Sequence, residues 1–270
     1  MITFKPPERI NFAAVNFSQK NIMELTQWIF GNTIILEPMT ALTDFIVTAV
    51  CIFGFFKLKA LAKKNGNNKS FVYFFLFMGL GTFFAALMTH AFSYAFTPEQ
   101  LSKSEIALLE WSDKLKVNLH NMPNWIFNVI SVTLFEIGII KQSKKHLEYL
   151  NTKFYFSIII IESVLIFAAT LYILKYDIAA AHIGFALYLI ELPLQIIIIK
   201  KNNAKEAKFL IIGTLLMLIT APVMALKLQI TKWFNFNDIS HVVIAITMYL
   251  FFLAGKEFYK EKTVQLKIEN

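Results

Sequence analysis

Residues 37–56 read EPMTALTDFIVTAVCIFGFF and decide the fold class of the chain. The segment is long and apolar enough to cross the hydrocarbon core of a bilayer as a single helix. It nevertheless begins with two acids, Glu37 and Asp44, which a helix places on nearly one face. Helix capping explains Glu37 but not Asp44, which lies deeper. Because a carboxylate inside a membrane helix is costly without a partner or water, this face predicts a functional site.

The remainder of the chain repeats the same pattern of long apolar blocks. It has 270 residues, of which 57% are hydrophobic and 16% are charged. Seven blocks are long enough to span a membrane, at about 38–56, 71–96, 122–140, 154–174, 178–199, 208–226 and 239–255. The sequence therefore predicts an all-α bundle of seven transmembrane helices over 37–256. An N-terminal segment (1–36) precedes the bundle and a short tail (257–270) follows it.

The positions of the basic residues predict how the chain is oriented in the membrane. A net charge of +8 is compatible with nucleic-acid binding, but the charges do not form one patch. Of the 26 Lys and Arg residues, 17 fall in the segments that follow the first, third, fifth and seventh blocks. The positive-inside rule then places the N-terminus outside and the C-terminus in the cytoplasm. We expect a multi-pass protein of the cell membrane whose partners are lipids and not nucleic acid.

Cysteine usage and the segments outside the spans add three expectations. Cys51 is the only cysteine and lies within a span, which excludes a disulfide or a thiolate metal cluster. Residues 21–31 (NIMELTQWIFG) have helical spacing and predict a short interfacial helix, with a packed loop as the alternative. The capping-box sequence SKSE at 102–105 predicts a second such helix, with Ile106, Leu109 and Leu115 on one side.

Histidines and acids gather at one predicted level of the bundle. Once the direction of each span is assigned, the outer level contains His90, His120, His182, His241, Glu37, Asp44 and Asp238. Neutral imidazole together with one or two carboxylates is typical zinc ligation. Interfacial or hydrogen-bonded histidines are the alternative, above all for His120 and His182.

We therefore predict a zinc site with His90 and His241 as ligands. Asp44 or His182 would be the third ligand. Asp238, which stands at a helix N-cap position, or Glu37 would orient a ligand or accept a proton.

Polar residues also occur deeper in the spans. Glu162 and Glu191 each lie about eight residues from the cytoplasmic end of a span, which predicts one common depth. Ser163, Tyr188 and Gln195 are candidate hydrogen-bond partners, and either a proton relay or a structural hydrogen bond would explain the acids. A row of polar residues at the start of the third span predicts a hydrogen-bonded seam or a wet cavity: Asn121, Asn124, Asn128 and Ser131.

Seven spans with a histidine near the end of the second and another at the start of the seventh resemble the CREST superfamily. That superfamily includes the alkaline ceramidases and the progestin and adipoQ receptors. The resemblance implies a seven-helix bundle with an intramembrane zinc ion and hydrolysis of lipid amides, with His90 and His241 at the matching motif positions. Ala86 stands where the family pattern has a serine, and Ala245 stands where it has a further histidine.

Three functions are compatible with these patterns. The first is a metal-dependent hydrolase acting on lipid amides or esters from the outer leaflet. The second is a transporter of small solutes or a proton-coupled carrier that uses the outer polar layer and the inner glutamates as two ends of a path. The third is a non-catalytic scaffold or receptor, although the chain lacks the NPxxY and acidic-Arg sequences of G-protein-coupled receptors.

Overall fold

The computed structural model describes residues 26–30, 33–65, 68–96 and 108–268, and confirms the all-α architecture with seven helices long and apolar enough to cross a membrane. The helices of the bundle and their connecting turns are α1 (Pro38–Asn65), α2 (Lys69–Phe84), η1 (Ala85–Ala91), α3 (Ser93–Phe96), α5 (Trp111–Asn118), η2 (Leu119–Asn121), α6 (Met122–His146), α7 (Thr152–Ile173), α8 (Tyr176–Gly184), η3 (Phe185–Glu191), α9 (Leu192–Asn202), α10 (Lys205–Ala225) and α11 (Phe236–Ile268). η1 and η3 are π-helical and continue the spans that contain them, whereas η2 is a 3₁₀ turn. The segment predicted as a C-terminal tail continues α11.

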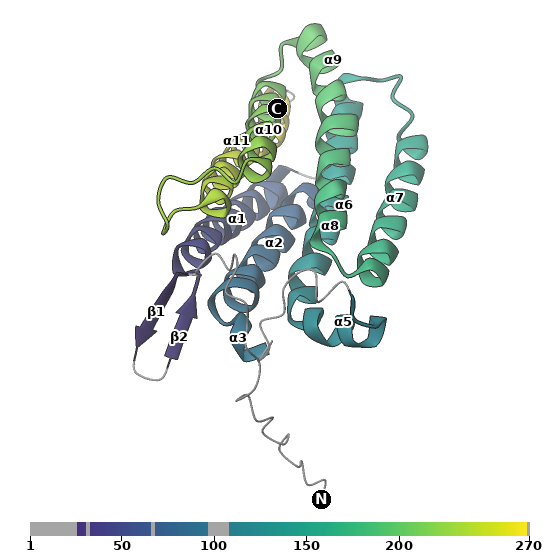
Figure 1. Ribbon diagram of the computed structural model, residues 1–270. Coiled ribbons are helices and arrows are strands. Elements are labelled where there is room, and N and C mark those ends of the chain that lie inside the picture. Colours follow the sequence, from purple (N-terminus) through teal and green to yellow (C-terminus); the bar gives the residue numbers. More distant parts are fainter. Residues whose placement is uncertain (1–25, 31–32, 66–67, 97–107, 269–270) are drawn as a thin grey trace, which may run out of the picture.

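A β-hairpin precedes the first span in place of the helix predicted over 21–31. β1 (Gln27–Phe30) pairs antiparallel with β2 (Thr33–Leu36), and residues 21–25 of the prediction lie outside the described part of the chain. In the sequence, runs of aromatic and β-branched residues flank the pair Gly31-Asn32, a combination typical of hairpins. We use the hairpin to name the two ends of the bundle, because it marks the end where α1 begins (Figure 1).

Six of the spans form a ring and the seventh lies outside it. α1, α2 and α6 are neighbours, η3 and α9 connect α6 to α10, and α11 closes the ring between α10 and α1. α7 packs mainly against α6 and α8, and lies at the edge of the bundle (Figure 1). Only 17% of the residues in its apolar stretch are buried, the smallest share among the seven spans. α7 is therefore the span with the largest surface available to lipid.

Aromatic side chains fill the half of the bundle that is remote from the hairpin. This aromatic cluster consists of buried phenylalanines on α2, α6 and α11: Phe71, Phe74, Phe75, Phe135, Phe251 and Phe258. The rings of Phe135 and Phe251 are stacked with centroids 5.2 Å apart. Gly213 lets α10 approach them, since a Cβ at this position would lie 2.7 Å from the ring of Phe251. Such close packing leaves the open space of the bundle at the hairpin end.

The second short helix differs in position from its prediction. Residues 97–107, which contain the SKSE sequence and Ile106, lie outside the described part of the chain. α5 begins at Trp111, so Leu109 precedes the helix and Leu115 lies within it. The indole Nε1 of Trp111 donates a hydrogen bond to the carbonyl of Tyr172 at 3.0 Å, which connects α5 to the end of α7.

Candidate functional site at the hairpin end

Glu37 links the hairpin to α1 in an unusual backbone conformation. Its φ is 41°, in the left-handed region that residues other than glycine rarely adopt. The amide of Glu37 donates a hydrogen bond to the carbonyl of Thr26, next to β1, at 2.8 Å. The carbonyl of Glu37 accepts a hydrogen bond from the amide of Ala41 at 3.0 Å. The hairpin and the first turn of α1 thus fix both sides of this residue. Strained positions of this kind are enriched at functional sites.

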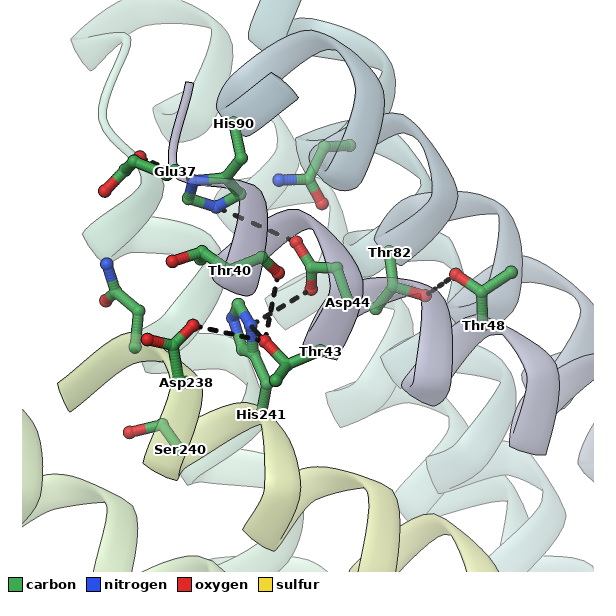
Figure 2. Close-up of polar contacts among 12 residues, drawn as sticks. Glu37, Thr40, Thr43, Asp44, Thr48, Thr82, His90, Asp238, Ser240 and His241 are labelled. Carbon is green, nitrogen blue, oxygen red and sulfur yellow. Dashed lines mark hydrogen bonds and ion pairs between the residues drawn. The ribbon is translucent and has the colours of Figure 1, made fainter. Parts of the chain in front are cut away.

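His90 lies between two carboxylates. Its Nδ1 atom is 2.9 Å from Oε2 of Glu37, and its Nε2 atom is 3.7 Å from Oδ2 of Asp44 (Figure 2). The histidine belongs to the π-helical segment η1, whose wider turn alters the direction of side chains relative to an α-helix. Both carboxylates come from the start of the first span, so α1 and the end of the second span meet at this histidine.

His241 completes the group from the start of α11. Its Nδ1 atom lies 3.1 Å from Oγ1 of Thr43 and 3.5 Å from Oδ1 of Asp44. The ring centroids of His90 and His241 are 6.1 Å apart, and Figure 2 shows Asp44 between the two rings. The sequence therefore predicted correctly that these two histidines and Asp44 converge. We call Glu37, Asp44, His90, Asp238 and His241 the hairpin-end cluster.

Asp238 has a different position in its helix from the one predicted. Asn235 is the N-cap of α11, because its carbonyl accepts the first helical hydrogen bond from Ile239 at 3.1 Å. Oδ2 of Asp238 accepts a hydrogen bond from the amide of Asn235 at 2.6 Å, the second half of a capping box. Its Oδ1 lies 3.5 Å from the hydroxyl of Thr43, and the residue is fully buried. Both oxygens of this acid thus have structural partners.

A cavity of about 650 Å³ adjoins the hairpin-end cluster. Asp44, His90 and His241 contribute to its wall at one level, and Phe74, Phe135 and Phe251 of the aromatic cluster contribute at the other. Between them the wall is largely apolar, with residues such as Val47, Met78, Val132, Leu187 and Met248. Its volume is within the range of sites that bind one small molecule.

Asparagine amides of η2 and α6 form part of the polar wall of the cavity. Asn121, Asn124 and Asn128 all line it, as the row of polar residues in the sequence suggested. Asn128 Nδ2 donates to Oδ1 of Asn124 at 2.6 Å, and Thr89 donates to Oδ1 of Asn121 at 2.7 Å. Thr89 precedes His90, so this amide row is connected to the hairpin-end cluster.

His182 does not join the hairpin-end cluster, contrary to the prediction. It is fully buried, and its Nε2 atom lies 2.9 Å from Oε2 of Glu162 and 3.3 Å from Oε2 of Glu136. The sequence had placed His182 at the outer level and Glu162 at an inner one, so the contact between them shows that the predicted depths were wrong for this pair. Glu136 was missed by the sequence interpretation, although a single acid within the apolar block of the third span was a signal for it. We call Glu136, Glu162 and His182 the α7 cluster.

The two glutamates that were expected at one depth have unrelated environments. Glu162 belongs to the α7 cluster, close to the middle of its helix. Glu191 ends η3 and accepts a hydrogen bond from Thr214 of α10 at 2.6 Å. Of the partners proposed from the sequence, Ser163 instead pairs with Thr133 at 2.8 Å, and Gln195 donates to Ser143 at 3.4 Å. Neither glutamate lines the cavity.

The residue types of the hairpin-end cluster are those found in zinc sites, but among the described residues the ligand atoms of only Glu136, Glu162 and His182 lie within 4.8 Å of one another. Two imidazoles and one carboxylate are a known ligand set for zinc in hydrolases, with a fourth position left for water. Oδ2 of Asp44 is buried and, among the described residues, has no hydrogen-bond partner. Glu37 contacts Nδ1 of His90, which leaves Nε2 available as a metal-binding atom on the side of Asp44.

Comparison with known proteins places the chain in one family. No curated protein and no solved structure matches it. The model of a family of unknown function, DUF6962, matches residues 39–260, which include all seven spans except the first residue of α1. The match extends over most of the chain and begins just after Glu37. The chain therefore belongs to the family of unknown function DUF6962.

Proposed function

We propose that the hairpin-end cluster and the adjoining cavity form the active site of a zinc-dependent hydrolase that cleaves an amide or ester bond of a lipid. The observation that carries the proposal is the position of Asp44 between His90 and His241, at 3.7 and 3.5 Å, on the wall of a cavity large enough for an acyl chain. Functional groups of this kind at one end of an apolar cavity are the usual arrangement of a binding site.

Three side chains supply the ligand set in this proposal: His90, His241 and Asp44. When bound, zinc lowers the pKa of a water molecule and polarises a carbonyl group. The hydrogen bond from His90 to Glu37 orients the imidazole and keeps Nε2 free to bind. Thr43 contacts Nδ1 of His241 at 3.1 Å, the atom that also faces Asp44, so while this contact is kept His241 would bind zinc through Nε2.

Glu37 and Asp238 differ in how far water can reach them, although neither lines the cavity and Glu37 faces the side of His90 away from Nε2. The side chain of Glu37 keeps 21% exposure, whereas Asp238 is fully buried and uses both oxygens in the capping box and the contact with Thr43. A group that accepts a proton from water must be reachable by water. Asp238 is accordingly a positioning residue in our proposal, acting on His241 through Thr43.

The shape of the cavity supports a lipid as the substrate. The polar groups lie at the hairpin end, and the wall becomes apolar toward the aromatic cluster. A molecule with a polar amide or ester and an apolar chain would place its reactive bond at the histidines and its chain among Met78, Val132 and Met248. The row of asparagines on η2 and α6 would offer hydrogen bonds to a polar head group.

A carrier function receives less support from the described residues. That function required the outer polar layer and the inner glutamates to form two ends of one path. Glu162 and Glu191 are instead bound to separate partners outside the cavity wall. The aromatic cluster also lies between the cavity and the far end of the bundle.

The test uses two separate variants, His90→Ala and His241→Ala, in the purified full-length chain. We expect each variant to bind one zinc ion fewer than the wild type and to lose hydrolysis of a short-chain ceramide or a lipid ester in detergent micelles. The matched control is Thr48→Val, because Thr48 lies on the same helix but pairs with Thr82 at 2.8 Å. A wild-type protein that hydrolyses neither substrate with zinc present, or histidine variants that retain full activity, would contradict the proposal.

A further inference from the structure

The α7 cluster brings three metal-binding side chains together at the middle of the bundle. Glu136 comes from α6, Glu162 from α7 and His182 from α8, and each offers one ligand atom within 4.8 Å of the other two. Glu136 and His182 are fully buried, and Glu162 retains 15% exposure. Three separate helices thus direct their only acid or imidazole at this depth toward one point.

The contacts within this cluster are close but incompletely hydrogen-bonded. Nε2 of His182 lies 2.9 Å from Oε2 of Glu162, yet among the described residues neither oxygen of Glu162 has a hydrogen-bond partner. Oε1 of Glu136 and Nδ1 of His182 are also buried without such a partner. Buried polar atoms are nearly always satisfied in native proteins. The carboxylate oxygens without partners lie on the two residues that face Nε2 of His182, and they point to a missing ligand there, whereas Nδ1 lies on the other side of the ring.

A bound cation would also stabilise the ionised form of the two acids. With both carboxylates ionised and the imidazole neutral, the cluster would carry a formal charge of −2 within the apolar part of three spans. Buried charges in that region pair with each other or with cations because the desolvation cost is otherwise large. Lys and Arg are absent from the apolar part of α6, α7 and α8, between 122 and 140, 154 and 173, and 176 and 184. A divalent cation would bring the formal charge to zero.

We infer that Glu136, Glu162 and His182 form a binding site for a divalent transition-metal ion of the zinc type. One imidazole nitrogen and two carboxylate oxygens suit zinc, whereas calcium prefers oxygen ligands alone. With bonds of about 2.1 Å, a tetrahedral ion separates its ligand atoms by about 3.4 Å. The observed contacts of 2.9 and 3.3 Å to Nε2 of His182 are close to that separation.

The ion connects α7 to the rest of the bundle. α7 lies outside the ring of six spans, and most of its side chains are exposed. Within the apolar part of α7, its polar contacts to the ring among the described residues include the pair Ser163–Thr133 and the approach of Glu162 to His182. An ion shared by three helices would fix the distance and rotation of α7 relative to α6 and α8, as structural metals do elsewhere.

This site is separate from the proposed active site and does not depend on it. Its residues do not line the cavity, although their neighbours Phe135 and Ile183 do. On α8, Ile183 faces the cavity and His182 faces α6 and α7. The two sites would therefore bind zinc independently.

The experiment is a zinc titration of the purified full-length chain in detergent, with bound metal measured by elemental analysis and by competition with a chelating dye. Glu136→Gln, Glu162→Gln and His182→Asn preserve side-chain size and remove one ligand each. Ser163→Ala is the matched control, because it removes the adjacent hydrogen bond to Thr133 but no ligand. All five proteins are also prepared with His90→Ala, so that zinc at the hairpin end does not contribute.

We expect one zinc ion per chain in the His90→Ala background, with affinity lowered at least about 100-fold by each ligand change and unchanged by Ser163→Ala. Zinc should also raise the thermal midpoint of the wild type and of Ser163→Ala. The inference is overturned if the wild type binds no such ion, or if the three ligand variants bind it as tightly as the wild type. Whether the wild type binds such an ion is decided by the wild-type measurement alone, so that outcome does not depend on how well the ligand variants fold.

Discussion

Nδ1 of His90 lies 2.9 Å from Oε2 of Glu37, a residue whose backbone has a φ of 41°. The contact joins the segment after the hairpin to the end of the second span. The strained backbone and the side-chain contact of Glu37 are separate properties, and substitution can distinguish them.

Glu37→Ala and Glu37→Gly distinguish the side-chain contact from the backbone strain. Both remove the hydrogen bond to His90, but only glycine adopts a positive φ without a steric cost. We expect Glu37→Gly to be more stable than Glu37→Ala by about 1 kcal/mol, measured by thermal unfolding in detergent. Equal stability of the two variants would show that the backbone at this position is not strained.

The orientation of the chain can be tested by cysteine labelling. The distribution of basic residues predicts residue 18 outside and residue 262 in the cytoplasm. Ser18→Cys in intact cells should react with a membrane-impermeant maleimide, and Lys262→Cys should react only after permeabilisation. The native Cys51 is fully buried in α1 and provides the unlabelled background. Labelling of residue 262 in intact cells would reverse the assignment.

Gly213→Ala tests the close approach of α10 and α11. The added Cβ would lie 2.7 Å from a carbon of the Phe251 ring, which is buried and cannot easily move. We expect a loss of about 1–3 kcal/mol in unfolding free energy. Gly184→Ala is the matched control, since its Cβ would meet only Tyr188 at 4.0 Å. For Gly184→Ala we expect an unchanged or higher unfolding free energy, because alanine favours a helix more than glycine does.

Glu206 stabilises the end of the bundle that is remote from the hairpin. Its Oε1 atom lies 2.8 Å from Nε2 of His146, so α10 is tied to the end of α6. Glu206→Ala should lower unfolding free energy by about 1–3 kcal/mol, because buried polar atoms lose their partner. Glu206→Gln, which retains an acceptor oxygen, should cost less.

The comparison for Glu206 is Asp113→Ala on α5. Asp113 pairs with Lys116 at 2.8 Å, but both side chains are about half exposed or more. Exposed pairs contribute little to stability, so a change within about 0.5 kcal/mol is expected. If both alanine variants cost the same, burial does not determine the strength of the Glu206 contact.

The fold could be predicted because a bilayer imposes a strong constraint on sequence. Each span needs about 20 apolar residues, and seven blocks of that kind are visible without any knowledge of packing. The hairpin before α1 was missed because Ile22, Leu25 and Ile29 have helical spacing, and that spacing outweighed the alternation of 27–36. Short segments outside the membrane lack the constraint of length, so local pattern alone is ambiguous.

For the candidate sites, the sequence could indicate at most the level of each residue along its span, and not which residues face one another. Span direction places Glu37, Asp44, His90 and His241 at one end, and these residues do meet. Rotation about each helix axis is set by packing, which one sequence does not reveal. Depth itself was wrong for His182 and Glu162, which were assigned to different levels but meet, and Glu136 was not identified.

The aromatic cluster has a consequence for how molecules enter and leave the cavity. Phe71, Phe75 and Phe258 are buried next to the cavity-wall residues Phe74 and Phe135, on the side that leads to the far end of the bundle. Under the proposed function, a molecule that reaches the histidines would meet this packed aromatic wall and leave by the route through which it came. A cleaved fragment that retains an acyl chain would then slow the next turnover by occupying the space that the following molecule needs.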